Sequence, residues 1–515
     1  MSTLSQLQYM QIPDIGLGLY TDVNPLQIPV GGASECSNIV WVSGYLQARP
    51  GLSTAYTPAP NADYVSHLNL YTDFNANSQL MRLSRNGTTL SLNKHNGAWS
   101  LLSGAIPGGS ASVAPTSCNF KGQFFFTTGD GDLYYYDGTT LGTVASLQSD
   151  VNLRIYNKPR IVIAGDARLF IADCHNKADG TGTRVPYRVA WSDLLNPGVW
   201  QGGIGDGSSG YVDLPKDSTP ITGLYYQNST IMVFKPNSIF LGFAVGPPAH
   251  YGFKEVVSGI GCVSHATIKR YREGIICWLG DDNVYVGGVN RQPQAVGDRI
   301  RSRLRQVIQL SAIEKARAVI DRQRHLYYLF LPDGVDYVGK VVRYFAINLR
   351  NGSWWEGAFD QAIDITDGLE YRDAPWSNQQ LLSTTDGRIL SFDFANTADL
   401  GTPFSVSWTS GVLSVRNFFK DTDQASFQLL RVVGPNAVSP TQMQLAVSVG
   451  KGLDRFETTI FGNQVIDGVS NIYQSGRPKT GETVKLQLST TNSSTMPKLA
   501  SIGIGAIPQG LNVKR

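Results

Sequence analysis

Runs of aromatic and β-branched residues alternate with short polar turns along most of this chain. The recurring unit is an apolar run, then an Asp-Gly, Asn-Gly or Asp-Asn pair, then a second apolar run. Asn or Asp before Gly suits the positive φ angles of a two-residue turn, so each unit predicts an antiparallel hairpin. Most units lie roughly 40 to 60 residues apart, a spacing typical of propeller blades. The clearest turns are at Asn86-Gly87, Asp130-Gly131, Asp333-Gly334 and Asp386-Gly387.

Between residues 59 and 399 the hairpin signals join into longer meanders. The segment from Ile221 to Phe243 contains three apolar runs separated by short polar turns, and a similar triplet runs from Ala318 to Ile347. Meanders of three or four strands in series are typical of a β-propeller, in which radial repetition protects the strand edges. The chain is therefore predicted to be all-β, with a β-propeller of about six or seven blades over residues 59–399.

The two ends of the chain differ from this central region. Residues 1–58 contain several prolines among Gly and Asn with little periodicity. This pattern predicts an extended N-terminal arm, which would pack on its own body or on a neighbouring subunit. Residues 400–515 contain fewer aromatics and alternate apolar with polar residues, as from Val484 to Leu488. Such alternation predicts a C-terminal β-sandwich.

One helical signal interrupts the propeller region, near residues 298–317. Ile300, Leu304 and Val307 recur at helical spacing, as on the apolar face of an amphipathic helix. Ser311 is a suitable cap for a second short helix. A short helical insertion is therefore expected here.

Composition narrows the possible functions. Of the 515 residues 42% are hydrophobic and only 16% are charged, against about 25% charged in typical soluble domains. Either other chains cover much of the surface, or Ser, Thr, Asn and Gln form its polar face; the two explanations are compatible. A net charge of +3 gives no general attraction to nucleic acid or membrane. No secretory signal is visible, and no apolar run could span a bilayer.

The sequence offers little catalytic chemistry. The five cysteines are widely spaced without a Cys-x-x-Cys pair, so reduced, buried thiols are expected in place of disulfides or zinc. There is no phosphate-binding loop, dinucleotide fingerprint or metal-binding histidine pair among the six histidines. We therefore expect no cofactor, no metal, no catalytic residues and no enzyme activity. The nearest matches to sialidase Asp-box turns, Asn351 to Trp354 and Asn96 to Trp99, lack the Ser-x-Asp start.

The sharpest charge feature is the segment around the predicted helix. Between residues 298 and 325 there are eight Lys or Arg and three Asp or Glu. These charges could face DNA phosphates or an acidic partner; the alternatives are a solvated helix face or inter-subunit ion pairs. We expect the arginines to pair with carboxylates at a subunit or partner interface, away from any DNA path. The candidate contact residues are Arg299, Arg301, Arg303 and Arg305.

Several motifs occur together in a recognisable order. The first motif runs from Gly31 to Ile39 and continues from Gly44 to Gly51, where it ends in Arg49-Pro50-Gly51. The second consists of Trp191-Ser192-Asp193 with Asn196-Pro197 and Trp200. Others follow in order: Ile221 to Leu224, Val233 to Lys235, Ser238-Ile239, Gly259 to Ser264, Lys315 to Ala318, and Asn348 with Gly352 to Trp354. This combination, over about residues 25 to 390, resembles the tail nozzle (head-completion or stabilisation) proteins of short-tailed bacteriophages.

The resemblance implies a structural virion protein. Members of this family form a hexameric ring below the portal and adaptor proteins, close the DNA channel before ejection and often dock fibres or spikes. Genome DNA would pass without specific binding, and the location would be the virion tail, assembled in the host cytoplasm. The family has no catalytic motif to transfer. A carbohydrate-binding or glycan-cleaving propeller of a tail spike remains the alternative, and the assembly state distinguishes the two.

Overall fold

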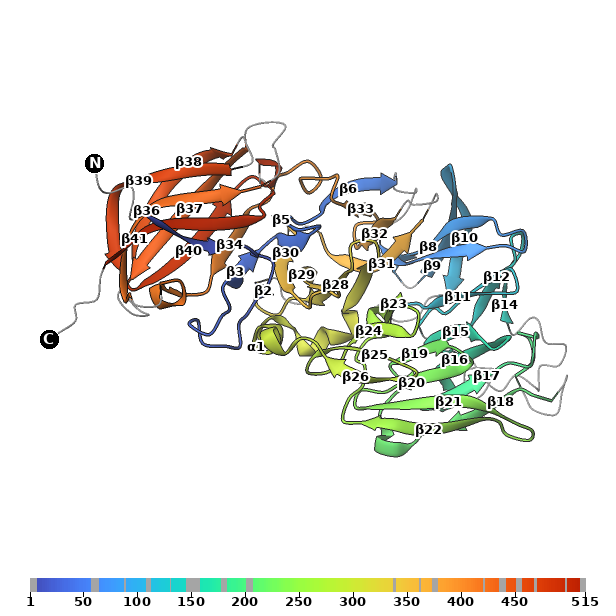
Figure 1. Ribbon diagram of the computed structural model, residues 1–515. Helices are drawn as coiled ribbons and strands as arrows, with labels where there is room; N and C mark the ends of the chain where they lie inside the picture. Colours follow the sequence, from blue (N-terminus) through green and yellow to red (C-terminus); the bar gives the residue numbers. More distant parts are fainter. Residues whose placement is uncertain are drawn as a thin grey trace.

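Between Gly51 and Asp393 the chain folds into a β-propeller of four-stranded antiparallel sheets, shown in Figure 1. In the described part of this region there are seven such sheets, which we call blades 1 to 7 in chain order. The structure is a computed structural model. It describes residues 7–56, 64–87, 89–107, 113–129, 131–144, 158–176, 183–200, 207–336, 340–360, 363–372, 378–419, 422–434, 441–450, 456–466, 470–495 and 498–509.

Each blade is a meander whose first strand lies innermost. Blade 1 consists of β7 (Val65–Thr72), β8 (Ser78–Asn86), β9 (Thr89–Asn96) and β10 (Ala98–Pro107). Blade 2 consists of β11 (Ser117–Phe120), β12 (Gln123–Phe126), β13 (Tyr134–Tyr136) and β14 (Leu141–Thr143). Blade 3 consists of β15 (Ile161–Gly165), β16 (Arg168–His175), β17 (Arg184–Trp191) and β18 (Gly210–Asp213). Blade 4 consists of β19 (Gly223–Gln227), β20 (Thr230–Phe234), β21 (Ser238–Gly246) and β22 (His250–Ser258). Blade 5 consists of β23 (Lys269–Arg272), β24 (Ile275–Leu279), β25 (Val284–Gly288) and β26 (Arg291–Ala295). Blade 6 consists of β27 (Arg317–Asp321), β28 (Leu326–Pro332), β29 (Val341–Asn348) and β30 (Trp354–Ala358).

Blade 7 contains strands from two distant parts of the chain. Its first three strands are β31 (Ile365–Tyr371), β32 (Gln379–Thr384) and β33 (Ile389–Asp393), and its outermost strand is β6 (Gly51–Tyr56). β6 pairs antiparallel with β33, Leu52 opposite Phe392. The blue β6 beside the orange β33 is visible in Figure 1. A strand that precedes blade 1 in the chain thus completes the last blade and closes the ring.

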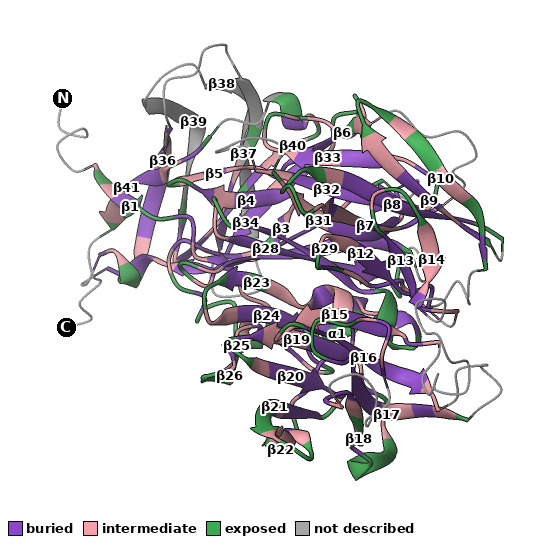
Figure 2. Ribbon diagram, turned by 90° about the vertical axis from the view of Figure 1, so that its right-hand side faces the viewer, coloured by how far each residue is buried: buried purple, intermediate pink, exposed green. Residues whose placement is uncertain are grey.

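Burial follows the position of a strand within its blade. All residues of β28 are buried, as expected for a strand covered on both faces. In the outermost strands β10 and β22, exposed and intermediate residues predominate, and Figure 2 shows this contrast. Aromatic pairs hold neighbouring strands together: Phe126 lies opposite Tyr134 with ring centroids 5.5 Å apart.

Two further sheets lie beside the propeller and are built from both ends of the chain. One has the order β1 (Gln8–Ile12), β41 (Ser501–Gln509), β36 (Gln424–Val433), β39 (Ser470–Gly481). The other has the order β2 (Gly18–Leu19), β3 (Gly32–Ser37), β34 (Val406–Ser410), β40 (Thr483–Thr490), β37 (Thr441–Gly450), β38 (Phe456–Ile466), with β35 (Leu413–Ser414) also paired to β40. The expected division at residues 58 and 400 therefore differs from the structure. The strands β1, β2 and β3, all within residues 8–37, belong to these sheets, and residues 51–56 belong to the propeller.

A continuous hydrophobic core joins the propeller to these two sheets. It contains Tyr328 and Phe345 from blade 6 together with Trp408, Leu486 and Ile504 from the two sheets. A hairpin of β4 (Ile39–Val42) and β5 (Tyr45–Ala48) lies between the two parts. Elsewhere in the described residues the helical turns are η4 (Lys216–Ser218), η5 (His265–Thr267), η8 (Val415–Asn417) and η9 (Ser493–Thr495).

The predicted helical insertion is present. It consists of η6 (Asp298–Ile300), α1 (Arg301–Val307) and η7 (Leu310–Lys315), and Ile300, Leu304 and Val307 are buried as the spacing indicates. Ser311 does not cap the second helix; Gln309 occupies that position without a side-chain hydrogen bond.

The predicted turns have different outcomes. Asn86-Gly87 joins β8 to β9, Asp386-Gly387 joins β32 to β33, and Gly87 and Gly387 have φ of 58° and 83°. Asp130 lies outside the described residues. Asp333-Gly334 begins a longer connection between β28 and β29. The Asp333 carboxylate is fully buried and accepts hydrogen bonds from Arg343 and two backbone N–H groups, which hold the chain in a wider loop.

Candidate functional site

A cavity of about 330 Å³, lined by both polar and apolar residues, lies where the innermost strands of the blades meet. Residues in or just before the first strand of every blade line it. Radial repetition explains this convergence, because each blade brings the start of its first strand to the same axis. Residues that are 50 to 300 positions apart in the sequence are therefore neighbours around one small space.

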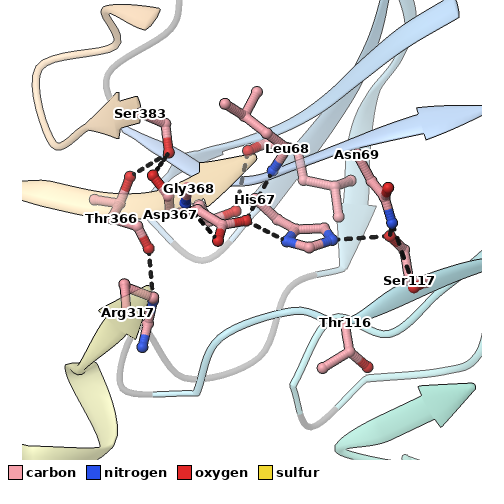
Figure 3. A network of polar contacts seen from close by, with 12 residues as sticks. His67, Leu68, Asn69, Thr116, Ser117, Arg317, Thr366, Asp367, Gly368 and Ser383 are labelled. Atoms are coloured by element: carbon pink, nitrogen blue, oxygen red, sulfur yellow. Dashed lines mark hydrogen bonds and ion pairs between the residues drawn. The ribbon is translucent and has the colours of Figure 1, made fainter. Parts of the chain in front are cut away.

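Three of these residues form a continuous hydrogen-bond chain, shown in Figure 3. The Oδ2 atom of Asp367 on β31 lies 2.6 Å from Nδ1 of His67 on β7. The other ring nitrogen of His67, Nε2, lies 2.8 Å from Oγ of Ser117 on β11. With Nδ1 protonated and donating to Asp367, Nε2 is free to accept the hydroxyl proton of Ser117.

Neighbouring groups hold the members of this chain in place. The Asp367 carboxylate also accepts the backbone N–H groups of Leu68, at 3.1 Å, and Gly368, at 2.8 Å. The Asn69 amide Nδ2 donates to Ser117 Oγ at 2.7 Å. His67 and Asn69 are two residues apart on one strand, so both side chains point to the cavity while Leu68 points into the core.

The cavity also contains cations that have few anionic partners. The Arg317 guanidinium is 6% exposed and donates to the carbonyl oxygens of Thr366, Glu314 and Ala316. The Lys269 ammonium donates to the carbonyl oxygen of Gly368 at 3.2 Å. Burial lowers the pKa of both side chains.

Electrostatic coupling across the cavity sets two further protonation states. Burial alone would raise the pKa of Asp367, but the electrostatic interaction and hydrogen bond with His67, together with Lys269 and Arg317, hold it well below its usual range. Burial, with the nearby Lys269 and His67, lowers the pKa of His265 to about 4. At neutral pH the cavity thus contains a charged carboxylate beside His67 and a neutral His265.

The four arginines expected at a partner interface lie elsewhere, around α1, and none is among the described residues that line the cavity. Arg301 pairs with Asp282, and Arg303 binds Glu356 through two hydrogen bonds of 3.0 Å. The Arg299 guanidinium lies 4.8 Å from the centre of the Tyr20 ring, and Arg305 is exposed. Two of the four predicted contacts are thus ion pairs within the chain.

The first motif of the family resemblance lies at the junction between the propeller and the two sheets beside it. Arg49 is 1% exposed, binds both carboxylate oxygens of Asp399 at 2.9 and 2.5 Å, and stacks on Phe404 at 3.8 Å. Asn38 accepts a hydrogen bond from Arg49 Nε and donates to the carbonyl of Ser405. This motif therefore locks the two parts together.

Other motif residues stabilise turns and blade contacts. The Asp193 carboxylate accepts the backbone N–H groups of Ser208 and Ser209, and Trp191 Nε1 donates to the carbonyl of Ser208. The fully buried Lys235 ammonium donates to two carbonyls and to Asp217. The motifs that contain Trp191, Asp193 and Lys235 therefore have structural roles.

Other chemistry is sparse in the described residues. They contain no group of three or more His, Cys, Asp or Glu that could hold a metal ion. The five cysteines are free, four of them buried, and burial raises the pKa of the Cys174 and Cys262 thiols to about 12. No helix in the described segments is long and apolar enough to cross a membrane.

The residues of the hydrogen-bond chain were missed by sequence reasoning. His67, Ser117 and Asp367 are separated by 50 and 250 positions, and none lies in a catalytic motif. The only sequence signal for their proximity is that each lies near the start of the first strand of a repeated unit, and that place is visible only once the blades are delimited.

Comparisons with known proteins assign this chain to no family. The sequence matches no model of a protein family and none of the curated proteins. Among solved structures, the Neurospora crassa Pan2 WD40 domain is similar with a TM-score of 0.36 and 9% identity, over 67% of this chain and 94% of that one. BBS1N, solved in complex with ARL6DN, has a TM-score of 0.39 and 9% identity, over 70% and 100%. PorZ of the type-IX secretion system of Porphyromonas gingivalis has a TM-score of 0.35 and 11% identity, over 84% and 53%.

Proposed function

We propose that this protein is a structural subunit of a short-tailed phage tail, which forms a ring that closes the DNA channel below the portal and adaptor proteins. The observation that carries the proposal is the Arg49 junction. Arg49 belongs to the first motif by which the sequence resembles tail nozzle proteins, and its ion pair with Asp399 lies between the propeller and the two sheets beside it. A subunit whose two parts share a core and a buried ion pair suits a permanent assembly, because it resists relative movement of its parts.

The proposed assembly is a hexamer, as the family resemblance implies, with fibres or spikes docked on its outside. DNA would pass through the opening at the centre of the ring and not through a propeller. The cavity on the propeller axis, of about 330 Å³, holds only a small molecule. Permanent interfaces of this kind bury on the order of 2,000 Å² or more.

The alternative of a glycan-binding or glycan-cleaving propeller has less support. Of the two turns nearest to an Asp-box, the one from Asn351 to Trp354 has a fully buried Trp354, whose Nε1 donates to the carbonyl of Val296. Packing therefore explains this tryptophan, which is not available to stack on a sugar.

Imaging of the purified protein, alone and with portal and adaptor proteins, tests the proposal. Closed rings with six copies are expected. A stable monomer at micromolar concentration, in the presence of those neighbours, would contradict it. Binding or turnover of a glycan by such a monomer would favour the alternative.

A further inference from the structure

The hydrogen-bond chain in the cavity has the order of a nucleophile, its base and a carboxylate. Asp367 binds Nδ1 of His67, and the opposite nitrogen binds the Ser117 hydroxyl, at 2.6 and 2.8 Å. This constellation activates serine for acyl transfer on several unrelated folds, and it is recognised by geometry and not by sequence position. The sequence predicted no enzyme activity, and these three positions carry no motif that would have changed that expectation.

The exposure of its residues to the cavity distinguishes this hydrogen-bond chain from a buried polar network. Ser117 and His67 both line the cavity, and the His67 side chain keeps 16% of its surface exposed. The Asp367 side chain is 9% exposed. The nucleophile and base therefore face a space in which a small molecule fits, and the less exposed carboxylate of Asp367 lines the same cavity.

We propose that Ser117, His67 and Asp367 form a catalytic unit for acyl transfer, and that the cavity takes small esters that carry a negative charge. The charge preference comes from Lys269 and Arg317, which line the same cavity and donate to carbonyl oxygens. A negatively charged group on the substrate would be attracted by both.

The reaction balances with water as the only co-reactant. Ser117 Oγ bonds to the ester carbonyl carbon while its proton moves to His67 Nε2, and Asp367 stabilises the resulting imidazolium. Collapse of the tetrahedral intermediate breaks the carbon–oxygen bond to the alcohol, which leaves with the proton from His67. Water then attacks the acyl group on Ser117 in the same way, which releases the acid and restores the serine. Asn69, whose amide donates to Oγ, is a positioning residue.

A fluorophosphonate probe tests the proposal on the full-length protein. An activated serine forms a covalent adduct with this reagent, and peptide mapping by mass spectrometry locates it. We expect the adduct on Ser117 in the wild type and its loss in His67→Gln. Ser311→Ala is the control, because Ser311 is exposed on η7 and is not among the described residues that line the cavity. This control should label like the wild type.

Two esters of matched length test the substrate class. The probes are 4-nitrophenyl butyrate, which is neutral, and mono-4-nitrophenyl succinate, which is anionic. Ser117→Ala should lower hydrolysis of both by more than about 100-fold. Lys269→Met should lower kcat/KM by about tenfold more for the anionic ester than for the neutral ester. Equal losses on both esters would overturn the charge preference.

One outcome separates catalysis from a purely structural role. The same three residues tie blades 1, 2 and 7 together, so their replacement could lower stability without any catalytic function. Absence of an adduct on Ser117 in the folded wild type would overturn the proposal, whatever the variants do to the melting temperature. This readout does not depend on whether Ser117→Ala folds.

Discussion

Buried arginines in this protein occupy two opposite environments. Arg49 is 1% exposed, with a carboxylate on its guanidinium and an aromatic ring on its face. Arg82 is also 1% exposed and stacks on Trp99 at 4.5 Å, but its three side-chain nitrogens have no hydrogen-bond partner in the described structure. Burial lowers the pKa of Arg82 to about 10. The two sites should therefore respond differently to loss of the charge.

Replacing Arg49 with Met should lower the free energy of unfolding by about 3–5 kcal/mol, because Asp399 would remain buried without its partner. Arg82→Met should be neutral or stabilising, since it removes a buried charge whose nitrogens have no hydrogen-bond partner in the described residues. Urea unfolding of both variants measures the difference. Equal effects at the two sites would show that the Arg49–Asp399 pair does not stabilise the junction.

His265 should make stability depend on pH. Its pKa in the folded protein is about 4, below the ordinary 6.5, because of burial and of the nearby Lys269 and His67, with Asp367 acting in the opposite direction. The unfolded chain therefore binds the proton first as the pH falls. Stability should be full above about pH 6.5 and decrease by up to about 3 kcal/mol toward pH 4. His265→Asn should flatten the unfolding free energy measured across this window; an unchanged slope would contradict the assignment.

At the scale of elements, α1 is tied to its own chain on one side and exposed on the other. Arg303 binds Glu356 of β30, which is 8% exposed. Arg303→Glu should therefore lower the free energy of unfolding by about 1–3 kcal/mol, because two carboxylates would face each other. Arg305→Glu changes an exposed residue and should stay within about 0.5 kcal/mol. Thermal melts compare the two variants.

The same pair of variants also tests the expected partner contact. Charge reversal at Arg301 or Arg303 would test this contact poorly, because both side chains form ion pairs within the chain. Arg305 has the more informative position. Loss of rings in a stable Arg305→Glu variant would place α1 at the interface, and intact rings would exclude this end of the helix.

How far the sequence predicts an element depends on the distance to its partner. The turns at Gly87 and Gly387 were predictable because positive φ and a short loop are local properties. The position of β6 was not, since it pairs with a strand more than 330 residues later. The same limit hid the contact of His67 with Asp367, which depends on closure of the whole ring.

At the scale of the molecule, residues near both chain ends complete each part of the fold. β1 pairs with β41, and β3 pairs with β34. Met10 and Ile12 of β1 are fully buried in the core that also holds Trp408. The predicted arm is therefore an integral part of its own subunit, and a neighbouring copy is not needed to bury it.

Deletion of residues 1–31 should consequently destabilise the subunit itself. The deletion removes β1 and β2, which leaves β41 and β3 as unpaired edges beside an opened apolar core. Exposed apolar edges favour aggregation, so a lower melting temperature and soluble aggregates on gel filtration are expected before any ring forms. Deletion of residues 1–6 is the matched control, because β1 and all its pairings begin at Gln8. A deletion variant of 1–31 that melts like the control, yet fails to form rings, would instead assign this segment to contacts between subunits.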